Sequence, residues 1–225
     1  MCAAISDVTM AIDEPALGTS GRPAVLLDRD GTVIVESNYL CDPAGVALET
    51  GAAAGLQVLA ASGYVLAVIT NQSGIARGRF GWAQTEMVNA RVAALLKTAG
   101  VDIAGWFVCP HGPADGCACR KPRAGLALAA AAVLGLDLSR SWIVGDKQSD
   151  IAAADAVGAR GVLMLTGHGG NHAAWARAAG HPVAATLHDA AGLILKTDAA
   201  RVPGGDQRPL FRRGNVRPPA RPAPR

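Results

Sequence analysis

The chain has 225 residues, which suits one sizeable α/β domain and is marginal for two. Half of the residues are hydrophobic but only 4% are aromatic, so the core must consist mainly of Ala, Val and Leu. The formal net charge of +3 is unevenly distributed, because residues 201–225 carry a balance of +6 and the rest of the chain about −3. A slightly acidic body that is poor in aromatics argues against a nucleic-acid-binding module.

No apolar run reaches the roughly 18 residues of a membrane span. The N-terminal segment has no basic region and carries Asp7, Asp13 and Glu14, which argues against a signal peptide. We therefore expect a cytoplasmic protein with an N-terminal extension over residues 1–22. Residues 199–225 are rich in Pro and Arg and lack periodicity, so we interpret them as a disordered tail. The tail either binds an anionic partner, such as nucleic acid or a membrane surface, or is a solubilising or vestigial extension, and we favour the second.

Within residues 23–198, short apolar runs alternate with Ala- and Leu-rich stretches of helical character. In chain order we expect a strand at Ala24–Leu27, a helix at Ala52–Ser62, a strand at Tyr64–Ile69, a helix at Ala83–Ala99, a strand at Gly105–Val108, a helix at Ala124–Leu134, a strand at Trp142–Val144, a helix at Ser149–Val157, a strand at Gly161–Leu165 and a helix at His172–Ala179. This alternation predicts an α/β fold, a Rossmann-like parallel sheet with helices on both faces. No segment between these elements is long enough for a large cap domain.

Polar residues gather where three of the predicted strands end. Asp28 and Asp30 follow the first strand, Thr70–Gly74 follows the second, and Gly145–Asp150 follows the fourth. The carboxyl ends of parallel strands lie at one edge of the sheet, which is where open α/β sheets bind ligands. The three segments therefore predict a single site.

Three acids of these segments, Asp28, Asp30 and Asp146, would repel one another if they converged without a cation. A hard divalent cation relieves that repulsion, and Mg²⁺ prefers carboxylate oxygens together with retained waters. Lys121 and Lys147 add positive charge at the same edge. Acids, Mg²⁺ and lysines together suit a phosphate group.

The second polar segment adds groups that bind anions. Thr70, Asn71 and Ser73 offer two hydroxyls and an amide at a turn that opens towards a helix, where backbone N–H groups attract phosphate. The Asp-x-Asp spacing then suits hydrolysis of a phosphate monoester through an aspartyl-phosphate. We expect Asp28 to attack phosphorus. We expect Asp30 to protonate the leaving alkoxide and later to deprotonate the attacking water.

Taken alone, the acids of "DRDG" are as compatible with a capped turn or a calcium-type loop as with a catalytic site. The stretch "DRDGTV" after an apolar strand, however, resembles motif I of the haloacid dehalogenase superfamily phosphatases. "VITNQSG" is similar to motif II, with Thr70 as the phosphate-binding hydroxyl, and "CRKP" supplies Lys121 in the role of motif III. "IVGDKQSDI" resembles motif IV, which implies that Asp146 is a magnesium ligand. The resemblance spans roughly residues 23–195.

Four soft metal ligands stand close together as C-x-H-x5-C-x-C. They are Cys109, His111, Cys117 and Cys119. Such a set can enclose a tetrahedral Zn²⁺ in a closed structural site and stabilise a loop too short to have a core. A disulfide pair is the alternative, and it is disfavoured in a chain without an export signal. We expect structural zinc.

The cysteine loop ends directly in Arg120 and Lys121, so a bound zinc ion would fix the approach of both cations to the phosphate. Together with "TNQSGIARG" and "VGDK", this loop resembles the D-glycero-D-manno-heptose 1,7-bisphosphate 7-phosphatases of nucleotide-activated heptose synthesis. The histidinol-phosphate phosphatases of histidine biosynthesis share the scheme, including the short zinc spacing, and are the alternative. The resemblance implies catalytic Mg²⁺ and structural Zn²⁺.

The same resemblance assigns residues to roles. The expected magnesium ligands are Asp28, Asp30 and Asp146. The expected catalytic residues are Asp28, Asp30, Thr70, Arg120 and Lys121. The expected substrate-binding residues are Glu36, Ser37, Asn38, Tyr39, Thr70, Asn71, Gln72, Ser73, Arg120, Lys121 and Lys147.

A small sugar phosphate is the expected substrate, a monomer is the expected state, and neither a membrane nor nucleic acid is an expected partner. A polynucleotide 3′-phosphatase would share the catalytic motifs but should display a basic groove. A zinc-stabilised nucleic-acid module would need aromatics and basic residues in the folded body. We interpret His168 as a surface or helix-end histidine. Asp150 either caps a helix or orients Lys147 or metal-bound waters.

Overall fold

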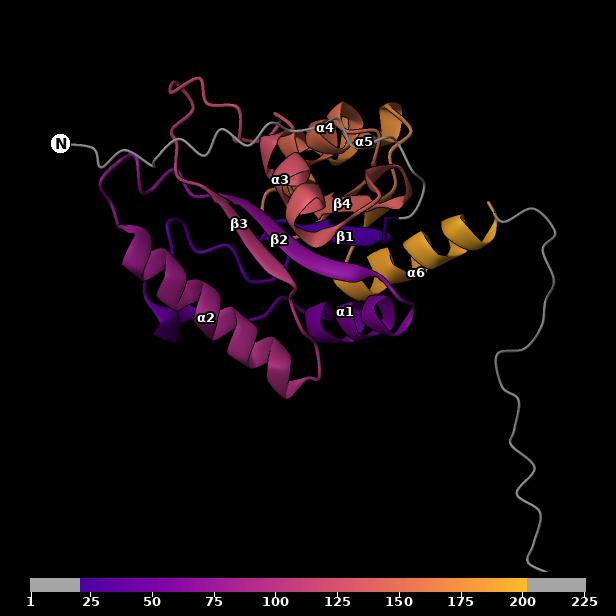
Figure 1. The fold of residues 1–225 in the computed structure, drawn as a ribbon, viewed down its shortest axis with the longest axis horizontal. Coiled ribbons are helices and arrows are strands. Elements are labelled where there is room, and N and C mark those ends of the chain that lie inside the picture. The colour runs from indigo at the N-terminus through magenta and orange to yellow at the C-terminus, as the bar shows by residue number, and fades with distance from the viewer. Residues whose placement is uncertain (1–20, 202–225) are drawn as a thin grey trace, which may run out of the picture.

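The computed structural model describes residues 21–201 of the chain. The predicted N-terminal extension and the predicted tail lie outside the described residues, apart from their inner ends. The described residues form a six-stranded sheet with helices on both faces (Figure 1), which confirms the predicted fold class. No cap domain interrupts the elements of this part of the chain.

All neighbouring strands of the sheet are parallel. The strands are β1 (Ala24–Leu27), β2 (Val65–Asn71), β3 (Gly105–Cys109), β4 (Trp142–Gly145), β5 (Arg160–Met164) and β6 (Val183–Ala184). Their order is β3-β2-β1-β4-β5-β6, so β2 and β4 flank β1 on opposite sides. The chain therefore reverses its direction across the sheet at β1, and a crevice forms at such a switch point beyond the carboxyl ends of the strands.

Helices cover the two faces of the sheet in two groups (Figure 1). One face carries α1 (Ala52–Ala61), α2 (Trp82–Thr98) and α6 (Leu187–Ala199). The other face carries α3 (Gly125–Leu134), α4 (Gln148–Ala156) and α5 (Ala173–Ala178). Short 3-10 turns lie at Pro43–Gly45, Leu138–Arg140 and Gly169–Asn171.

The central strand divides its side chains between the two cores. Val25 and Leu27 pack into the cluster beneath α1, α2 and α6, whereas Ala24 and Leu26 pack beneath α3 and α4. This follows from the two-residue period of a strand, which sends successive side chains to opposite faces. All four side chains are fully buried, so the end of β1 is a rigid support for the residue that follows it, Asp28.

The predicted strands and helices are present with boundaries that shift by one or two residues. Two elements were missed, namely β6 and α6. The strand β6 has only two residues, too few for a recognisable pattern. The helix α6 starts with a capping box in which Thr186 and Asp189 exchange hydrogen bonds, and this spacing was the available signal.

None of the helices formed by residues 21–201 has the length and apolar character that crossing a lipid bilayer requires.

Candidate active site

A cavity of about 310 Å³ opens at the carboxyl ends of the strands, at the switch point beside β1. Every residue expected to bind magnesium or substrate, or to act in catalysis, lines it except Ser37 and Asp146. Asp146 is fully buried, but its Oδ1 lies 3.0 Å from the Nζ of Lys147, which does line the cavity. The lining also includes residues to which the sequence analysis gave no substrate role: Leu40, Gly74, Ser149, Asp150 and His168.

Lys121 lies at the floor of this cavity between two acids. Its Nζ is 2.8 Å from Asp28 Oδ1 and 2.7 Å from Asp150 Oδ1, and it donates to the main-chain oxygen of Ile69 at 2.8 Å. The side chains of Lys121, Asp28 and Asp150 are nearly inaccessible to solvent. The side chain of Asn71 also holds the main chain of Lys121, accepting from its N–H and donating to its C=O at 3.1 Å each. The lysine is thereby fixed at both ends.

Asp146 is held in a pocket that only glycine backbones leave open. A Cβ on Gly31 would come within 2.5 Å of Asp146 Oδ2, and a Cβ on Gly167 would overlap the same oxygen. Both glycines have positive φ, of 74° and 52°. The oxygen accepts instead from the main-chain N–H of His168 at 2.8 Å. The two glycines therefore allow the turns after β1 and β5 to close around the carboxylate.

The Asp30 side chain points to a different set of partners. Arg29 Nε and Nη2 donate to its two carboxylate oxygens at 3.1 and 3.2 Å. Gln72 Nε2 donates to Oδ2 at 2.7 Å and also to the hydroxyl of Thr70 at 2.9 Å. Asp30 and the turn after β2, which is predicted to bind phosphate, are thus joined directly by Gln72.

The two acids of the Asp-x-Asp segment differ in acidity. Burial alone would raise the pKa of Asp28, but the ammonium groups of Lys121 and Lys147 outweigh it and hold that pKa below its usual value. Burial raises the pKa of Asp30, and the guanidinium of Arg29 offsets this only in part. Asp28 is therefore ionised, as a nucleophile must be, and Asp30 is more readily protonated, as a general acid must be.

A divalent cation fits the acids of this site. Asp28, Asp146 and Asp150 each offer a buried oxygen, and these oxygens all lie within 4.8 Å of one another. Burial, followed by the charge of Asp28, raises the pKa of Asp146, and burial raises that of Asp150 to about 6. Since Lys121 and Lys147 supply only two positive charges to three carboxylates, a hard cation would relieve the remaining repulsion. The Asp30 side chain does not belong to this cluster.

The rim of the cavity is formed by the segments that come after β1 and β5 in the sequence. Glu36 Oε2 lies 3.7 Å from Lys147 Nζ and 3.5 Å from His168 Nε2. Beyond Glu36, Asn38 and Tyr39 both adopt positive φ, and the guanidinium of Arg79 stacks over the Tyr39 ring at 4.6 Å. The segment 36–39, which was expected to bind substrate, therefore lies at the mouth of the cavity and contacts the turn that follows β2.

His168 could have been recognised as a lining residue from its position after a strand, as Asp150 was through the segment Gly145–Asp150. His168 stands four residues after β5 ends, at the same sheet edge as the other polar segments. Asp150 accepts from the main-chain N–H of Lys147 at 2.9 Å, so it forms the predicted helix cap. It also pairs with Lys121 through its second oxygen.

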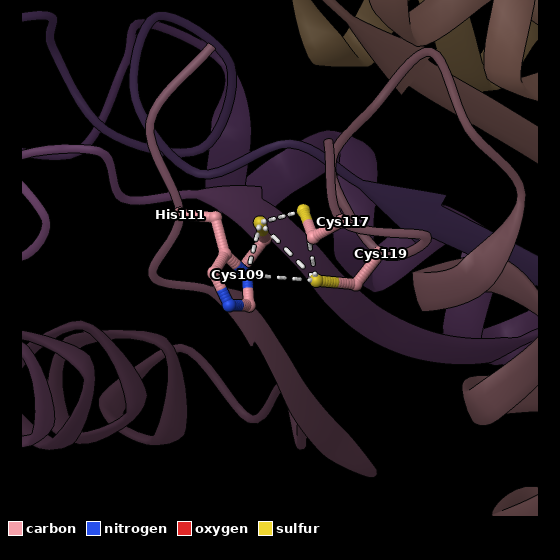
Figure 2. Close-up of side chains that lie close together, drawn as sticks. All are labelled: Cys109, His111, Cys117 and Cys119. Atoms are coloured by element: carbon pink, nitrogen blue, oxygen red, sulfur yellow. Dashed lines mark hydrogen bonds between the residues drawn. The ribbon is translucent and has the colours of Figure 1, made fainter. Parts of the chain in front are cut away.

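The four soft ligands converge as the sequence predicted (Figure 2). The three sulfur atoms lie 3.3–3.7 Å apart, and His111 Nδ1 lies 3.6 Å from Cys109 Sγ and 3.3 Å from Cys119 Sγ. A tetrahedral ion with Zn–S bonds of about 2.3 Å separates its sulfur ligands by roughly 3.7 Å. The cysteines are free thiols, so the disulfide alternative does not apply in the described chain.

The cysteine loop also holds Arg120. Its Nη1 donates to the main-chain oxygen of His111 at 3.1 Å, and Arg120 and Lys121 both line the cavity. The loop and the cavity therefore share a border, as expected from the sequence.

This fold and this site define the class of the protein, which is a phosphatase of the haloacid dehalogenase superfamily. The family model described as HAD-hydrolase-like matches residues 118–190. The D-glycero-β-D-manno-heptose-1,7-bisphosphate 7-phosphatase of Pseudomonas putida is 41% identical over 150 residues, which cover 64% of this chain and 83% of that enzyme. The enzyme of the same name from Salmonella typhi is 36% identical over 184 residues, 78% of this chain and 90% of that enzyme.

A solved structure agrees with these sequence relatives. The D,D-heptose 1,7-bisphosphate phosphatase from B. bronchiseptica, in complex with magnesium and phosphate, matches with a TM-score of 0.72 at 32% identity. The match covers 78% of this chain and 99% of that one. The chain belongs to the family of the D-glycero-β-D-manno-heptose-1,7-bisphosphate 7-phosphatases.

Proposed function

We propose that this chain removes the 7-phosphate of D-glycero-β-D-manno-heptose 1,7-bisphosphate in a magnesium-dependent reaction. The relatives carry that substrate, with its β anomer, in their names, and the solved relative holds magnesium and phosphate. The observation that carries the proposal within this chain is the pair of acids in one cavity, Asp28 with a lowered pKa and Asp30 with a raised pKa.

In the first step, Asp28 attacks the phosphorus atom of the 7-phosphate and forms an aspartyl-phosphate. Lys121 and the hydroxyl of Thr70 hold the phosphoryl oxygens, and Asp30 gives its proton to the departing sugar alkoxide. Support for these roles comes from the fixed position of Lys121 beside Asp28 and from the link between Asp30 and Thr70 through Gln72.

In the second step, Asp30 takes a proton from water, the water attacks the aspartyl-phosphate, and Asp28 is released as a carboxylate with inorganic phosphate. Asp28 and Asp146 would hold the magnesium ion, and the assignment of Asp30 as a third ligand stays a prediction. When bound, the ion neutralises the carboxylates and the charge on the phosphoryl oxygens. Lys147 stays beside Asp146 and adds a further positive charge near the phosphate.

The cysteine and histidine cluster is proposed to hold a structural zinc ion. Its four ligands leave no position for a substrate, and burial raises the pKa of Cys109 to about 12, which makes an unmetallated thiolate there unfavourable. Zinc bound here would keep Arg120 directed at the cavity through the His111 carbonyl. A set of metal-binding thiols suits a reducing compartment, so a cytoplasmic location is part of the proposal. The monomeric state stays a prediction.

Phosphate release from a panel of substrates tests the proposal. The panel contains the β and α anomers of the heptose bisphosphate, histidinol phosphate and a 3′-phosphorylated oligonucleotide, each with Mg²⁺ and with EDTA. We expect the β anomer to have the highest kcat/KM and EDTA to abolish turnover. A higher kcat/KM for histidinol phosphate would overturn the substrate assignment, and equal rates in EDTA would overturn the requirement for the metal.

A further inference from the structure

A buried hydrogen-bonded chain leads from helix α2 to the catalytic acid. Asn89, on the buried side of α2, accepts from Arg29 Nη1 through its Oδ1 at 2.8 Å. Arg29 is only 1% exposed, and its other guanidinium nitrogens donate to Asp30. Sixty residues of sequence separate Arg29 from Asn89, so only the tertiary fold brings them together.

All three nitrogens of the Arg29 guanidinium therefore have assigned partners. Nε and Nη2 bind the two oxygens of Asp30, and Nη1 binds Asn89. The guanidinium group is planar and rigid. The hydrogen bond from Nη1 to Asn89 therefore fixes the orientation of the whole group, including the direction in which Nε and Nη2 point at the Asp30 carboxylate. If Asn89 were replaced by an apolar residue, Nη1 would be buried without a partner, and the group would have to turn to find one.

The main chain of Arg29 is fixed as well. Its carbonyl oxygen accepts from the N–H groups of Val33 and Ile34 at 3.0 Å. Rotation of the side chain is thus the remaining freedom, and Asn89 restricts it. The Arg29 side chain does not line the cavity, and neither does Asn89, so any effect of Asn89 on the reaction must pass through another residue.

We propose that Asn89 is a positioning residue that acts through Arg29 to orient the carboxyl group of Asp30 for proton transfer to the leaving group. This inference rests on the proposed role of Asp30 as general acid. It extends that role by naming the two residues, one of them on α2, that aim the carboxyl group. In the first step, a misplaced acid lowers the rate only where the leaving group needs a proton.

The dependence of the rate on the leaving group tests this role. The kcat/KM of Asn89→Leu is measured with p-nitrophenyl phosphate, whose phenolate leaves without a proton, and with the alkyl phosphate of the panel that the wild type hydrolyses fastest. Since general acids contribute about 10²–10⁴-fold, we expect roughly a tenfold loss for the alkyl ester and less than about twofold for the aryl ester. Steps after departure of the leaving group do not enter kcat/KM.

Two further variants separate positioning from stability. Asn89→Asp keeps an acceptor for Arg29 and should retain the wild-type ratio of alkyl to aryl kcat/KM. Val88→Ala removes buried contacts of the same helix without removing a hydrogen bond, so it should lower the Tm but leave that ratio unchanged. An unchanged ratio of alkyl to aryl kcat/KM in Asn89→Leu would overturn the proposal, whether both values fall equally or neither falls. A wrong substrate assignment appears separately, as a different fastest member of the panel.

Discussion

The ammonium group of Lys121 lies 2.8 Å from the carboxylate of Asp28 in a site that excludes almost all solvent. This contact has two consequences. It keeps Asp28 ionised although burial favours the protonated form, and in the proposed mechanism it places a positive charge beside the phosphoryl oxygens during attack. The same ammonium also pairs with Asp150, whose carboxylate is as deeply buried. Lys121 therefore stabilises the fold and, in the proposed mechanism, also the phosphoryl group during transfer.

Replacing Lys121 with Met separates these two functions. Breaking a buried ion pair costs about 3–5 kcal/mol, so we expect a marked fall in Tm. Loss of an electrostatic stabiliser of the transition state should lower kcat/KM by about 10²–10³-fold. The double variant Lys121→Met/Asp150→Asn removes one unpaired buried charge and should recover part of the Tm but none of the activity. Thermal unfolding and steady-state kinetics measure the two effects. Recovery of turnover in the double variant would contradict a direct role of Lys121.

Asp30→Ala should make the phosphorylated enzyme accumulate, because the base that takes a proton from water in the second step is removed. With p-nitrophenyl phosphate labelled with ³²P, whose phenolate leaves without a proton so that the first step still proceeds, we expect acid-stable label on the protein in Asp30→Ala and a fall in kcat of about 10²-fold or more. Asp28→Asn is the matched control, since it keeps the size of the side chain and should yield no label. Label on Asp28→Asn would show that another residue is the nucleophile.

Much of the fold could be predicted because its strands are short apolar runs with clear boundaries. β1 was predicted without error, since Asp28 ends a run of four buried residues. The start of the missed helix α6 is marked by the capping box of Thr186 and Asp189, a signal of residue spacing and not of hydrophobicity. β6 exists because β5 offers it a partner edge, which is a tertiary effect with no local signal.

The site was predictable where a residue follows a strand directly, and less so where tertiary contacts decide its role. Thr70 and Asp146 fall in motifs at strand ends, and both lie in or beside the cavity. The pairing of Asp150 with Lys121, by contrast, joins α4 to a loop far away in sequence. Arg29 and Asn89 meet only after α2 has packed on the sheet, so no spacing in the sequence could indicate their contact.

Cys109→Ser should cost stability more than chemistry. A closed structural site loses most of its affinity when one of four ligands is removed, and the binding free energy of such an ion is folding free energy. We expect the zinc content to fall well below one ion per chain. We also expect the Tm to fall by roughly 5–10 °C, since each kcal/mol shifts the Tm by about 2–4 °C in a chain of this size. Below the new Tm, kcat should stay within about tenfold of the wild type, because no zinc ligand contacts the reacting atoms.

Metal analysis after gel filtration, thermal unfolding and steady-state kinetics test this prediction. Cys41→Ser is the matched control, because Cys41 is an exposed thiol outside the cluster and its loss should leave the zinc content unchanged. Wild-type protein without zinc would remove the basis of the structural site.

A second polar network stabilises the opposite edge of the sheet from the active site. Asp198, near the end of α6, accepts from the hydroxyl of Tyr64 and from Trp142 Nε1, the latter at 3.1 Å, and it pairs with Arg160. The guanidinium of Arg160 stacks over the Trp142 ring at 4.2 Å. The network therefore ties α6 to the beginnings of β2, β4 and β5, so it should contribute to stability without affecting turnover.

Tyr64→Phe should lower the Tm near pH 8, because a hydrogen bond to a charged acceptor is lost. Burial and then the carboxylate of Asp198 raise the pKa of Tyr64 above its usual value of about 10. A raised pKa in the folded state means that the unfolded chain releases the phenolic proton first as the pH rises. The stability that Tyr64 contributes is thus fully present below about pH 10 and declines above it.

The difference in Tm between wild type and Tyr64→Phe, measured by circular dichroism from pH 8 to 11, should therefore shrink at the alkaline end. Tyr39→Phe, a change of the other tyrosine of the chain, controls for general alkaline effects. A difference that stays constant or widens with pH would contradict the assigned contact with Asp198.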